Sequence, residues 1–259
     1  MEFSITEKAK IARISRSSAG PRYYAGVPRL SGSPLEGKTH RLPSDEQGAR
    51  FASLASIVRF KKGQQVYSDG DVGRAIFSII DGVIKIYRPR PHGGEYVFGF
   101  HYPDHLFGLT GQGLYVNSAE AITSVTAYLL PLDALGKSKD SDLALQVIEK
   151  LYRELRHAQR HAELLAQKHA LSRLAMFLQL QEHRGSTNKA AGEIYLPMDR
   201  SSIASYVGMT LAAVSRGFSG LVVRGIIKFT DRRHVQIIDR EAFDALASDS
   251  NANRDPARA

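Results

Sequence analysis

The alternation of apolar and polar positions changes character along the chain. From residue 51 to about residue 135, short runs rich in β-branched and aromatic residues are separated by turn-forming pairs, at Asp69-Gly70, Asp81-Gly82 and Gly93-Gly94. Short strands at regular spacing are typical of a β-sandwich or a barrel-like roll. We therefore expect a β-roll over residues 51–138.

From Ser141 onward, apolar residues recur with the period of a helix instead. The absence of proline and glycine between Ser141 and Gln181 favours one long helix or two abutting ones. Steps of four and three residues form a heptad seam, which predicts a dimerisation helix over residues 139–168. The expected seam residues are Ile148, Leu151, Leu155, Ala158, Ala162 and Leu165. The same pattern also fits a helix that packs on its own β-roll.

Residues 169–247 have the order helix, turn, helix and hairpin. Asp199 and Thr210 are placed to cap two successive helices, and Gly208 lies between them in the position of a tight turn. The segment GIIKFTDRRHVQIID predicts a two-stranded wing, and REAFDALA predicts a short closing helix. The expected fold class is therefore α+β: an N-terminal β-roll, a long dimerisation helix and a C-terminal winged helix-turn-helix.

The second helix of this pair has an apolar back and a polar front. Its outward face is expected to present Leu211, Ala212, Ser215, Arg216 and Ser219. The N-terminal end of such a helix is the part that enters the major groove of DNA. Arg216 can donate two parallel hydrogen bonds to O6 and N7 of guanine, and apolar side chains suit the methyl group of thymine. We expect these five residues to read bases.

The charge balance favours a polyanionic partner without identifying one. The chain has 35 Lys and Arg against 26 Asp and Glu, which gives a formal net charge of +9. Residues 1–50 are rich in Ser, Gly, Pro and Arg and predict a flexible basic extension. Residues 248–259 predict a polar tail.

The absence of cysteine excludes several kinds of chemistry. Disulfides, cysteine–zinc sites, iron–sulfur clusters and thiol catalysis all need that residue. No apolar run approaches the ~20 residues that span a bilayer, and the N-terminus lacks the apolar core of a secretory signal. We therefore expect a cytoplasmic protein with no membrane partner.

Residues 51–247 resemble the CRP/FNR family of bacterial transcription regulators. The stretch MDRSSIASYVGMTLAAVSRGFSGL is similar to the pattern IADYLGLTxExVSR of the FixK branch. A second similar stretch is DGVIKIYRPRPHGGEYVFGFHYPDHLFGL, followed by SAEAI. The resemblance implies a β-roll of the cyclic-nucleotide-binding type and a homodimer that binds palindromic double-stranded DNA. It also implies recruitment of RNA polymerase and hence an activator.

The resemblance assigns roles to individual side chains. Arg216 takes the position of the guanine-reading Arg, and Ser215 takes that of the Ser that reads the adjacent base. The positions that contact phosphate in the family are occupied by Arg200, Ser201, Thr210, Arg232 and Arg233. Ala212 replaces a Glu that accepts a hydrogen bond from cytosine N4, at a loss of about 1–3 kcal/mol of discrimination. We expect a half-site related to TTGA but altered at the pair that the Glu would read.

The β-roll lacks the residues that hold a cyclic nucleotide in this family. Gly108-Leu109 stands where a Gly-Glu pair holds the ribose, and Asn117-Ser118 stands where Arg with Ser or Thr holds the phosphate. A phosphate without its Arg loses a bidentate partner, so we do not expect cyclic AMP to bind. We expect no cofactor and no metal.

Histidine ligation is the open alternative to a regulator without a cofactor. His101 and His105 flank a proline, and His157 and His161 share a helix face at i, i+4 spacing, so either pair could hold haem or a metal ion. A metal-dependent small-barrel enzyme using His92, His101 and His105 is a competing function, as is an effector-binding module without specific DNA readout. No H-x-H pair and no Ser-His-Asp arrangement stands out, so we expect no enzyme activity.

Overall fold

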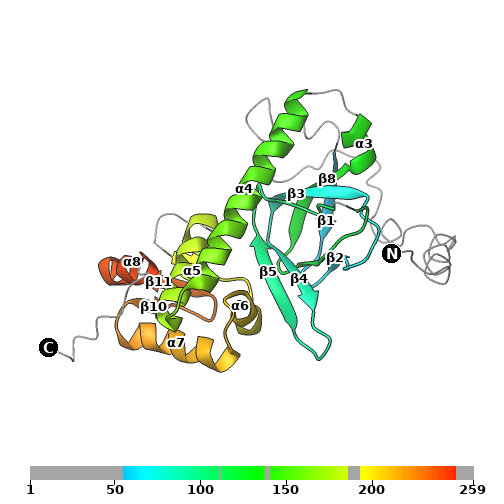
Figure 1. Cartoon of the computed structure of the whole chain (residues 1–259). Helices are drawn as coiled ribbons and strands as arrows, with labels where there is room; N and C mark the ends of the chain where they lie inside the picture. Colours follow the sequence, from blue (N-terminus) through cyan, green and yellow to red (C-terminus); the bar gives the residue numbers. More distant parts are fainter. Residues whose placement is uncertain (1–54, 111, 138–140, 186–192, 249–259) are drawn as a thin grey trace, which may run out of the picture. The chain divides into compact units, whose positions relative to one another are not determined.

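The computed structural model describes residues 55–110, 112–137, 141–185 and 193–248. The basic extension predicted over residues 1–50 lies outside the described residues, and so do residues 249–259 of the predicted tail. The described elements follow one another in the predicted order: β-strands, long helices, and then a helix pair with a small sheet (Figure 1).

The first part of the described chain folds as two four-stranded antiparallel sheets (Figure 1). In the first sheet the order is β1 (Ser56–Phe60), β8 (Val125–Pro131), β3 (Ala75–Asp81) and β6 (Leu106–Phe107). In the second sheet the order is β2 (Gln65–Tyr67), β7 (Ser118–Ala121), β4 (Ile84–Pro89) and β5 (Glu95–His101). Side chains from both sheets, among them Ile76, Ile84 and Leu130, are fully buried. The predicted β-roll is confirmed.

Glycine turns fix the path between these strands. Gly93 and Gly94, with φ of 91° and 79°, close the hairpin between β4 and β5. Gly82 (φ 90°) carries the chain from one sheet to the other, because β3 pairs with β8 whereas β4 pairs with β5 and β7. A Cβ atom on Gly82 would lie 2.2 Å from the carbonyl oxygen of Ser124, so this turn needs glycine.

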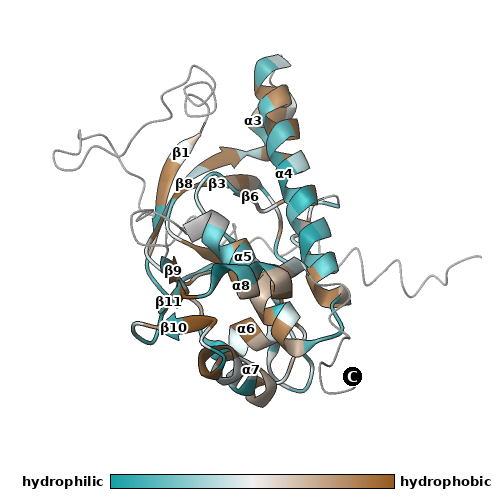
Figure 2. Cartoon of the chain, turned by 90° about the vertical axis from the view of Figure 1, so that its left-hand side faces the viewer, coloured by the Kyte–Doolittle hydropathy of each residue, from teal (hydrophilic) through white to brown (hydrophobic). Residues whose placement is uncertain are grey.

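Two abutting helices follow the roll. After the short α3 (Leu132–Lys137), α4 covers Ser141–Ala166 and α5 covers Ala170–Gly185. On one side of α4, Leu143, Val147 and Leu164 are buried in the core of the chain. Apolar residues also recur on the exposed side of this helix (Figure 2). The helix is therefore apolar on two sides and uses one of them within the chain.

The last part is a helix pair with a small wing. The helices α6 (Arg200–Tyr206) and α7 (Leu211–Val223) are bent by 98° relative to each other. The wing is a three-stranded sheet with the order β10 (Ile227–Phe229), β11 (His234–Ile237) and β9 (Glu193–Tyr195), and α8 (Arg240–Ser248) follows it. Among the described helices none is by itself both long and apolar enough to cross a membrane; α6 and α7 reach that length only together, across their bend.

Both predicted helix caps are present. A carboxylate oxygen of Asp199 accepts a hydrogen bond from the backbone N–H of Ser202 at 2.7 Å. The hydroxyl oxygen of Thr210 accepts one from the N–H of Ala213 at 3.1 Å. Gly208 has a φ of 64° and makes the turn between the helices, as the sequence predicts.

A glycine lets α7 approach α5 closely. Gly217 is buried, and a Cβ atom there would lie only 2.4 Å from Cδ1 of Leu174. Val214, Phe218 and Leu221 complete the buried back of α7. This packing fixes which side of α7 faces outward.

Candidate nucleic-acid interface

The front of α7 is open to solvent. All the residues predicted to read bases are exposed: Leu211, Ala212, Ser215, Arg216 and Ser219. Leu211 is 51% exposed at the first position of the helix, where its side chain can make an apolar contact. No Asp or Glu occurs in α7, so none of its own side chains would repel a polyanion. The front combines one guanidinium, two hydroxyls and a small apolar surface.

The hydroxyl of Thr210 caps α7 and is also exposed to solvent. Its oxygen caps α7, but a hydroxyl can donate one hydrogen bond as well as accept. Thr210 is exposed, so its proton can be donated to an external acceptor such as a phosphate. Ser201, the neighbouring candidate in α6, donates its hydroxyl proton to Oδ1 of Asp199 at 3.1 Å. A phosphate contact by Ser201 therefore requires its hydroxyl to turn away from Asp199.

The guanidinium of Arg200 packs against two aromatic rings and is not fully solvated. Its guanidinium carbon lies 4.2 Å from the centre of the Phe218 ring and 4.7 Å from that of Phe229. Burial lowers the pKa of Arg200, and Nη1 is buried without a hydrogen-bond partner among the described residues. Arg200 therefore packs α6 against α7 and the wing, and any contact with phosphate must use its remaining donors.

The wing presents its two arginines unequally. Arg232 is exposed, whereas Arg233 is partly buried and donates from Nη1 to the carbonyl oxygen of Pro197 at 3.2 Å. Asp231 holds the turn, because its Oδ1 accepts from the N–H of Arg233 at 2.6 Å and from that of His234 at 2.9 Å. Hydrogen bonds from Arg233 and His234 lower the pKa of Asp231, so this carboxylate stays ionised.

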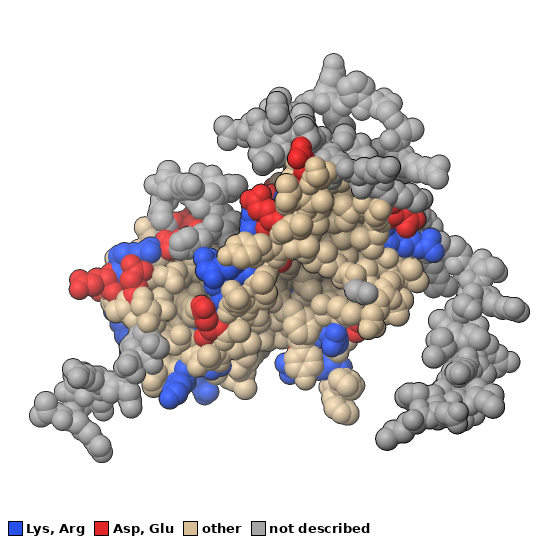
Figure 3. Space-filling model, turned by 45° about the horizontal axis from the view of Figure 1, so that its top comes forward, with Lys and Arg blue, Asp and Glu red and all other residues tan. Residues whose placement is uncertain are grey.

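Two further exposed cations follow the reader residues in the sequence. Arg224 at the end of α7 and Lys228 in β10 are exposed, and neither belongs to the set expected from the family resemblance. Elsewhere the charge is mixed: on the face shown in Figure 3, Lys and Arg side chains form several separate groups, and some of these lie beside Asp and Glu. On that face the net positive charge is therefore not gathered into one block.

The predicted seam lies mostly on the exposed side of α4. Ile148, Leu155 and Leu165 are 59%, 55% and 43% exposed, and Ala158 and Ala162 are exposed as well. Leu151 is the exception, because it is partly buried and packs against the core cluster of the β-roll. Tyr152 and Leu145, which are absent from the expected seam, are 61% and 62% exposed. The described chain thus leaves an apolar stripe along α4 without intramolecular cover.

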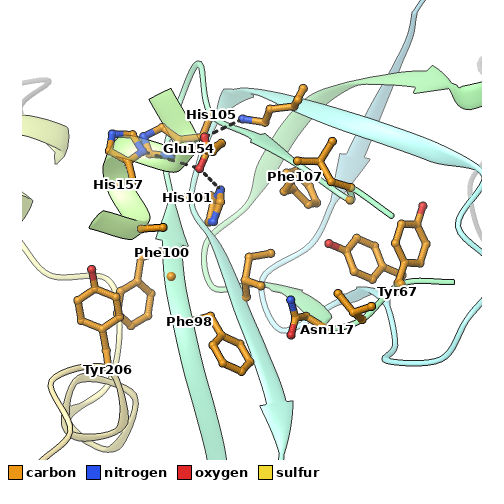
Figure 4. A pocket seen from close by; sticks show the side chains of 18 residues that line it. Tyr67, Phe98, Phe100, His101, His105, Phe107, Asn117, Glu154, His157 and Tyr206 are labelled. Carbon is orange, nitrogen blue, oxygen red and sulfur yellow. Dashed lines mark hydrogen bonds and ion pairs between the residues drawn. The ribbon is translucent and has the colours of Figure 1, made fainter. Parts of the chain in front are cut away.

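A cavity of about 250 Å³ lies between the β-roll and α4 (Figure 4). Gly108, Leu109 and Asn117 line it, and the lining includes no Arg or Lys among the residues that the structure describes. Arg88 donates to Oδ1 of Asn117 at 3.5 Å, but it is also paired with Asp69 at 3.3 Å and does not line the cavity. A phosphate inside the cavity would have no bidentate partner among these lining residues.

One wall of this cavity carries ionisable side chains. His101 and His105 lie next to Glu154 of α4, with His157 beside them (Figure 4). The two histidines that flank the proline are therefore brought together, but their partner is a carboxylate that the histidine pattern does not indicate. Imidazole and carboxylate are both ligands of transition metals.

Two family models match the chain. The Crp-like helix-turn-helix domain matches residues 172–246, and the cyclic nucleotide-binding domain matches residues 57–140. The nitrogen fixation regulation protein FixK of Bradyrhizobium diazoefficiens is 30% identical over 201 residues, which cover 76% of this chain and 84% of that protein. The chain belongs to the CRP/FNR family of transcriptional regulators.

Further members place the chain near the FixK-like branch of the CRP/FNR family. The transcriptional activator protein anr of Pseudomonas aeruginosa is 30% identical over 204 residues, which cover 75% of this chain and 83% of that protein. The structure of FixK2 from Bradyrhizobium japonicum matches with a TM-score of 0.69 and 29% identity, over 76% of this chain and 98% of that one. The resemblance to the FixK branch is confirmed.

The CRP/FNR relatives are transcriptional regulators and not enzymes. His92, which the competing enzyme interpretation needs, lies in the exposed turn between β4 and β5. The CRP/FNR helix-turn-helix domain of this chain presents its reader helix with the polar front outward. The residues of α7 that carry the family motif are therefore accessible from solvent.

Proposed function

We propose that this CRP/FNR protein is a transcriptional activator that binds, as a homodimer, a palindromic DNA site related to the FNR-type TTGA half-site. The observation that carries the proposal is the outward polar front of α7, supported from behind by a fully buried apolar back. A rigid helix held in this way can enter a major groove without losing its packing.

Arg216 and Ser215 carry the base readout in this proposal. Both are exposed on the same turn of α7, one turn after its N-terminus. Arg216 donates two hydrogen bonds to a guanine, and Ser215 contacts the adjacent base. Leu211, Ala212 and Ser219 border these two residues and complete the contact surface.

The proposed site differs from the family consensus because of Ala212. Its methyl side chain is exposed near the start of α7 and cannot accept a hydrogen bond from cytosine N4. Discrimination at that base pair should therefore fall by about 1–3 kcal/mol. A small apolar side chain at this place also leaves room for a thymine methyl group.

Phosphate contacts would fix the orientation of the helix on the duplex. We assign them to Arg200, Ser201, Thr210, Arg232 and Arg233, among which Arg232 and Thr210 are the most accessible. Arg200 and Arg233 contribute mainly by holding α6 and the wing in place, since their guanidinium groups already have contacts within the chain. Such contacts set affinity and register without reading sequence.

The homodimer would form through the apolar stripe on α4. Ile148, Tyr152 and Leu155 are each more than half exposed, and they recur at intervals of four and three residues. This is the spacing of a two-helix seam. Two subunits joined along α4 would each present one α7 to DNA, and the spacing of the half-sites would be about one turn of the duplex.

Selection of binding sites from random duplexes tests this function. Wild-type protein should enrich a palindrome that is relaxed at one position in each half-site, and Ala212→Glu should sharpen that position. A fully stringent family consensus from the wild type would contradict the role of Ala212. Absence of any enriched sequence would contradict specific readout altogether and favour an effector-binding module. The logarithm of the affinity should fall linearly with the logarithm of the salt concentration, as phosphate contacts require.

A further inference from the structure

The side chains of His101, His105 and Glu154 meet at the wall of the cavity (Figure 4). Each offers one ligand atom, and the three atoms all lie within 4.8 Å of one another. Nδ1 of His101 is 3.5 Å from Oε2 of Glu154, and Nδ1 of His105 is 3.3 Å from Oε1. Two ligand atoms bound at about 2.1 Å to one tetrahedral ion are roughly 3.4 Å apart. The separations from His101 and from His105 are each close to that value, and they involve the two different oxygens of the Glu154 carboxylate.

The three side chains come from elements that are fixed relative to one another. His101 is the last residue of β5, His105 lies in the loop between β5 and β6, and Glu154 lies in the middle of α4. The loop contains Asp104, whose φ is 72° and whose carboxylate pairs with Lys150 and Arg153 of α4. These ion pairs hold the loop that carries His105 against the helix that carries Glu154.

The carboxylate of Glu154 is held in a defined orientation. Its Oε1 accepts a hydrogen bond from the backbone N–H of Leu106 at 3.2 Å. This hydrogen bond restrains the carboxylate, so Glu154 has little freedom to turn.

The surroundings exclude most of the solvent. The side chains of His101, His105 and Glu154 are 17%, 11% and 15% exposed. The ring of His157 stacks on that of His105, with centroids 4.3 Å apart and planes 11° apart, which restrains the orientation of His105.

We propose that His101, His105 and Glu154 bind one divalent first-row transition-metal ion, with the remaining coordination positions directed to the cavity. Two imidazoles and one carboxylate form a common ligand set for such ions, zinc and ferrous iron included. The volume of about 250 Å³ is below the ~300–1,000 Å³ of most small-molecule sites, which favours an ion over a bulkier cofactor.

The bound ion would join the β-roll to α4. Two ligands belong to the roll and one belongs to the helix that carries the exposed apolar stripe. The metal site goes beyond the proposed DNA-binding function and does not depend on it. Metal binding can therefore be tested without DNA, and a failure of one proposal would leave the other intact.

The test is a titration of the full-length, tag-free, chelator-treated protein with Co²⁺. We expect one Co²⁺ per chain, visible d–d absorption, and displacement of Co²⁺ by Zn²⁺. His105→Ala and Glu154→Gln should each weaken binding at least about 10-fold. His92→Ala, a change in the exposed β4–β5 turn, is the matched control and should bind as the wild type does.

A thermal melt provides a second measurement that reports folding at the same time. Zn²⁺ should raise the Tm of the wild type and of His92→Ala, because the ion binds the folded state, and should raise the Tm of Glu154→Gln less. Circular dichroism identifies any variant that fails to fold. Folded wild-type protein that takes up no Co²⁺ at micromolar concentration would overturn the proposal. Uptake of Co²⁺ by Glu154→Gln and by His105→Ala equal to that of the wild type would overturn the proposal as well.

Discussion

The guanidinium of Arg200 lies over the ring of Phe218, with its central carbon 4.2 Å from the ring centre. Phe229 of the wing flanks the same guanidinium at 4.7 Å. The first residue of α6 is thus stacked between the back of the reader helix and the wing. In this position Arg200 of α6 contacts both the reader helix and the wing.

Arg200→Ala should reduce stability as well as DNA binding. Loss of a partly desolvated cation–π contact should lower the free energy of unfolding by about 1–2 kcal/mol. DNA affinity should fall to a similar extent for all sequences. Arg232→Ala, at an exposed wing position, should weaken DNA binding while its urea unfolding midpoint stays at the wild-type value. An unchanged midpoint for Arg200→Ala would show that the stacking contributes nothing.

Arg216→Ala should cost about 1–3 kcal/mol of binding free energy per half-site and relax the preference at one base pair. The reason is the loss of both hydrogen bonds to guanine. Arg224→Ala is the control, since Arg224 is exposed at the opposite end of α7. Gel-shift titrations against the selected site and a site altered at that pair would measure both effects. A variant of Arg216 that still discriminates the two sites would contradict its role.

Ile148→Glu should separate the subunits of the proposed dimer. An unpaired charge buried at a seam costs about 3–5 kcal/mol, which is more than a hundred-fold in the dissociation constant of the dimer. Sedimentation equilibrium at micromolar concentration would measure this change in the dissociation constant of the dimer. Leu151→Glu should behave differently and destabilise the fold itself, because Leu151 packs against the β-roll. If Ile148→Glu sediments as a dimer, the exposed stripe is not the dimer interface.

Two glycines of α7 should respond oppositely to alanine. Gly217→Ala would push a methyl group to within 2.4 Å of Leu174 and should cost about 1–3 kcal/mol of stability. At Gly220 the new atom would lie 3.5 Å from Leu171, an ordinary contact, and the higher helix propensity of alanine should add up to about 1 kcal/mol. Urea unfolding of both variants would decide whether close approach at Gly217 is required.

Sequence was sufficient for features that depend on residues within one helical turn. The caps at Asp199 and Thr210 need only a backbone N–H three positions further on, and both form as predicted. Gly208 has the positive φ that its place between two helices requires. The exposed front of α7 follows in the same way from the period of a single helix.

Features that join distant segments could not be predicted. The stacking of Arg200 depends on Phe229, which belongs to another element. Nothing in the sequence around Glu154 indicates that its carboxylate lies beside the side chain of His101 in β5. The apolar period of α4 does not tell which of its two stripes faces the roll: Leu151, which is expected in the seam, is partly buried and packs against the core cluster of the β-roll.

Helix α4 has two apolar sides, one buried in the chain and one exposed, and its residues are divided between them. Leu164 is buried in the core of the chain, whereas the adjacent Leu165 belongs to the exposed stripe. Each residue added to an α-helix rotates everything beyond it by about 100°. One inserted residue after Glu154 would therefore turn Leu164 away from the core and move the stripe out of line. A seven-residue insertion would nearly restore both, so the length of this helix should vary, if at all, in whole heptads.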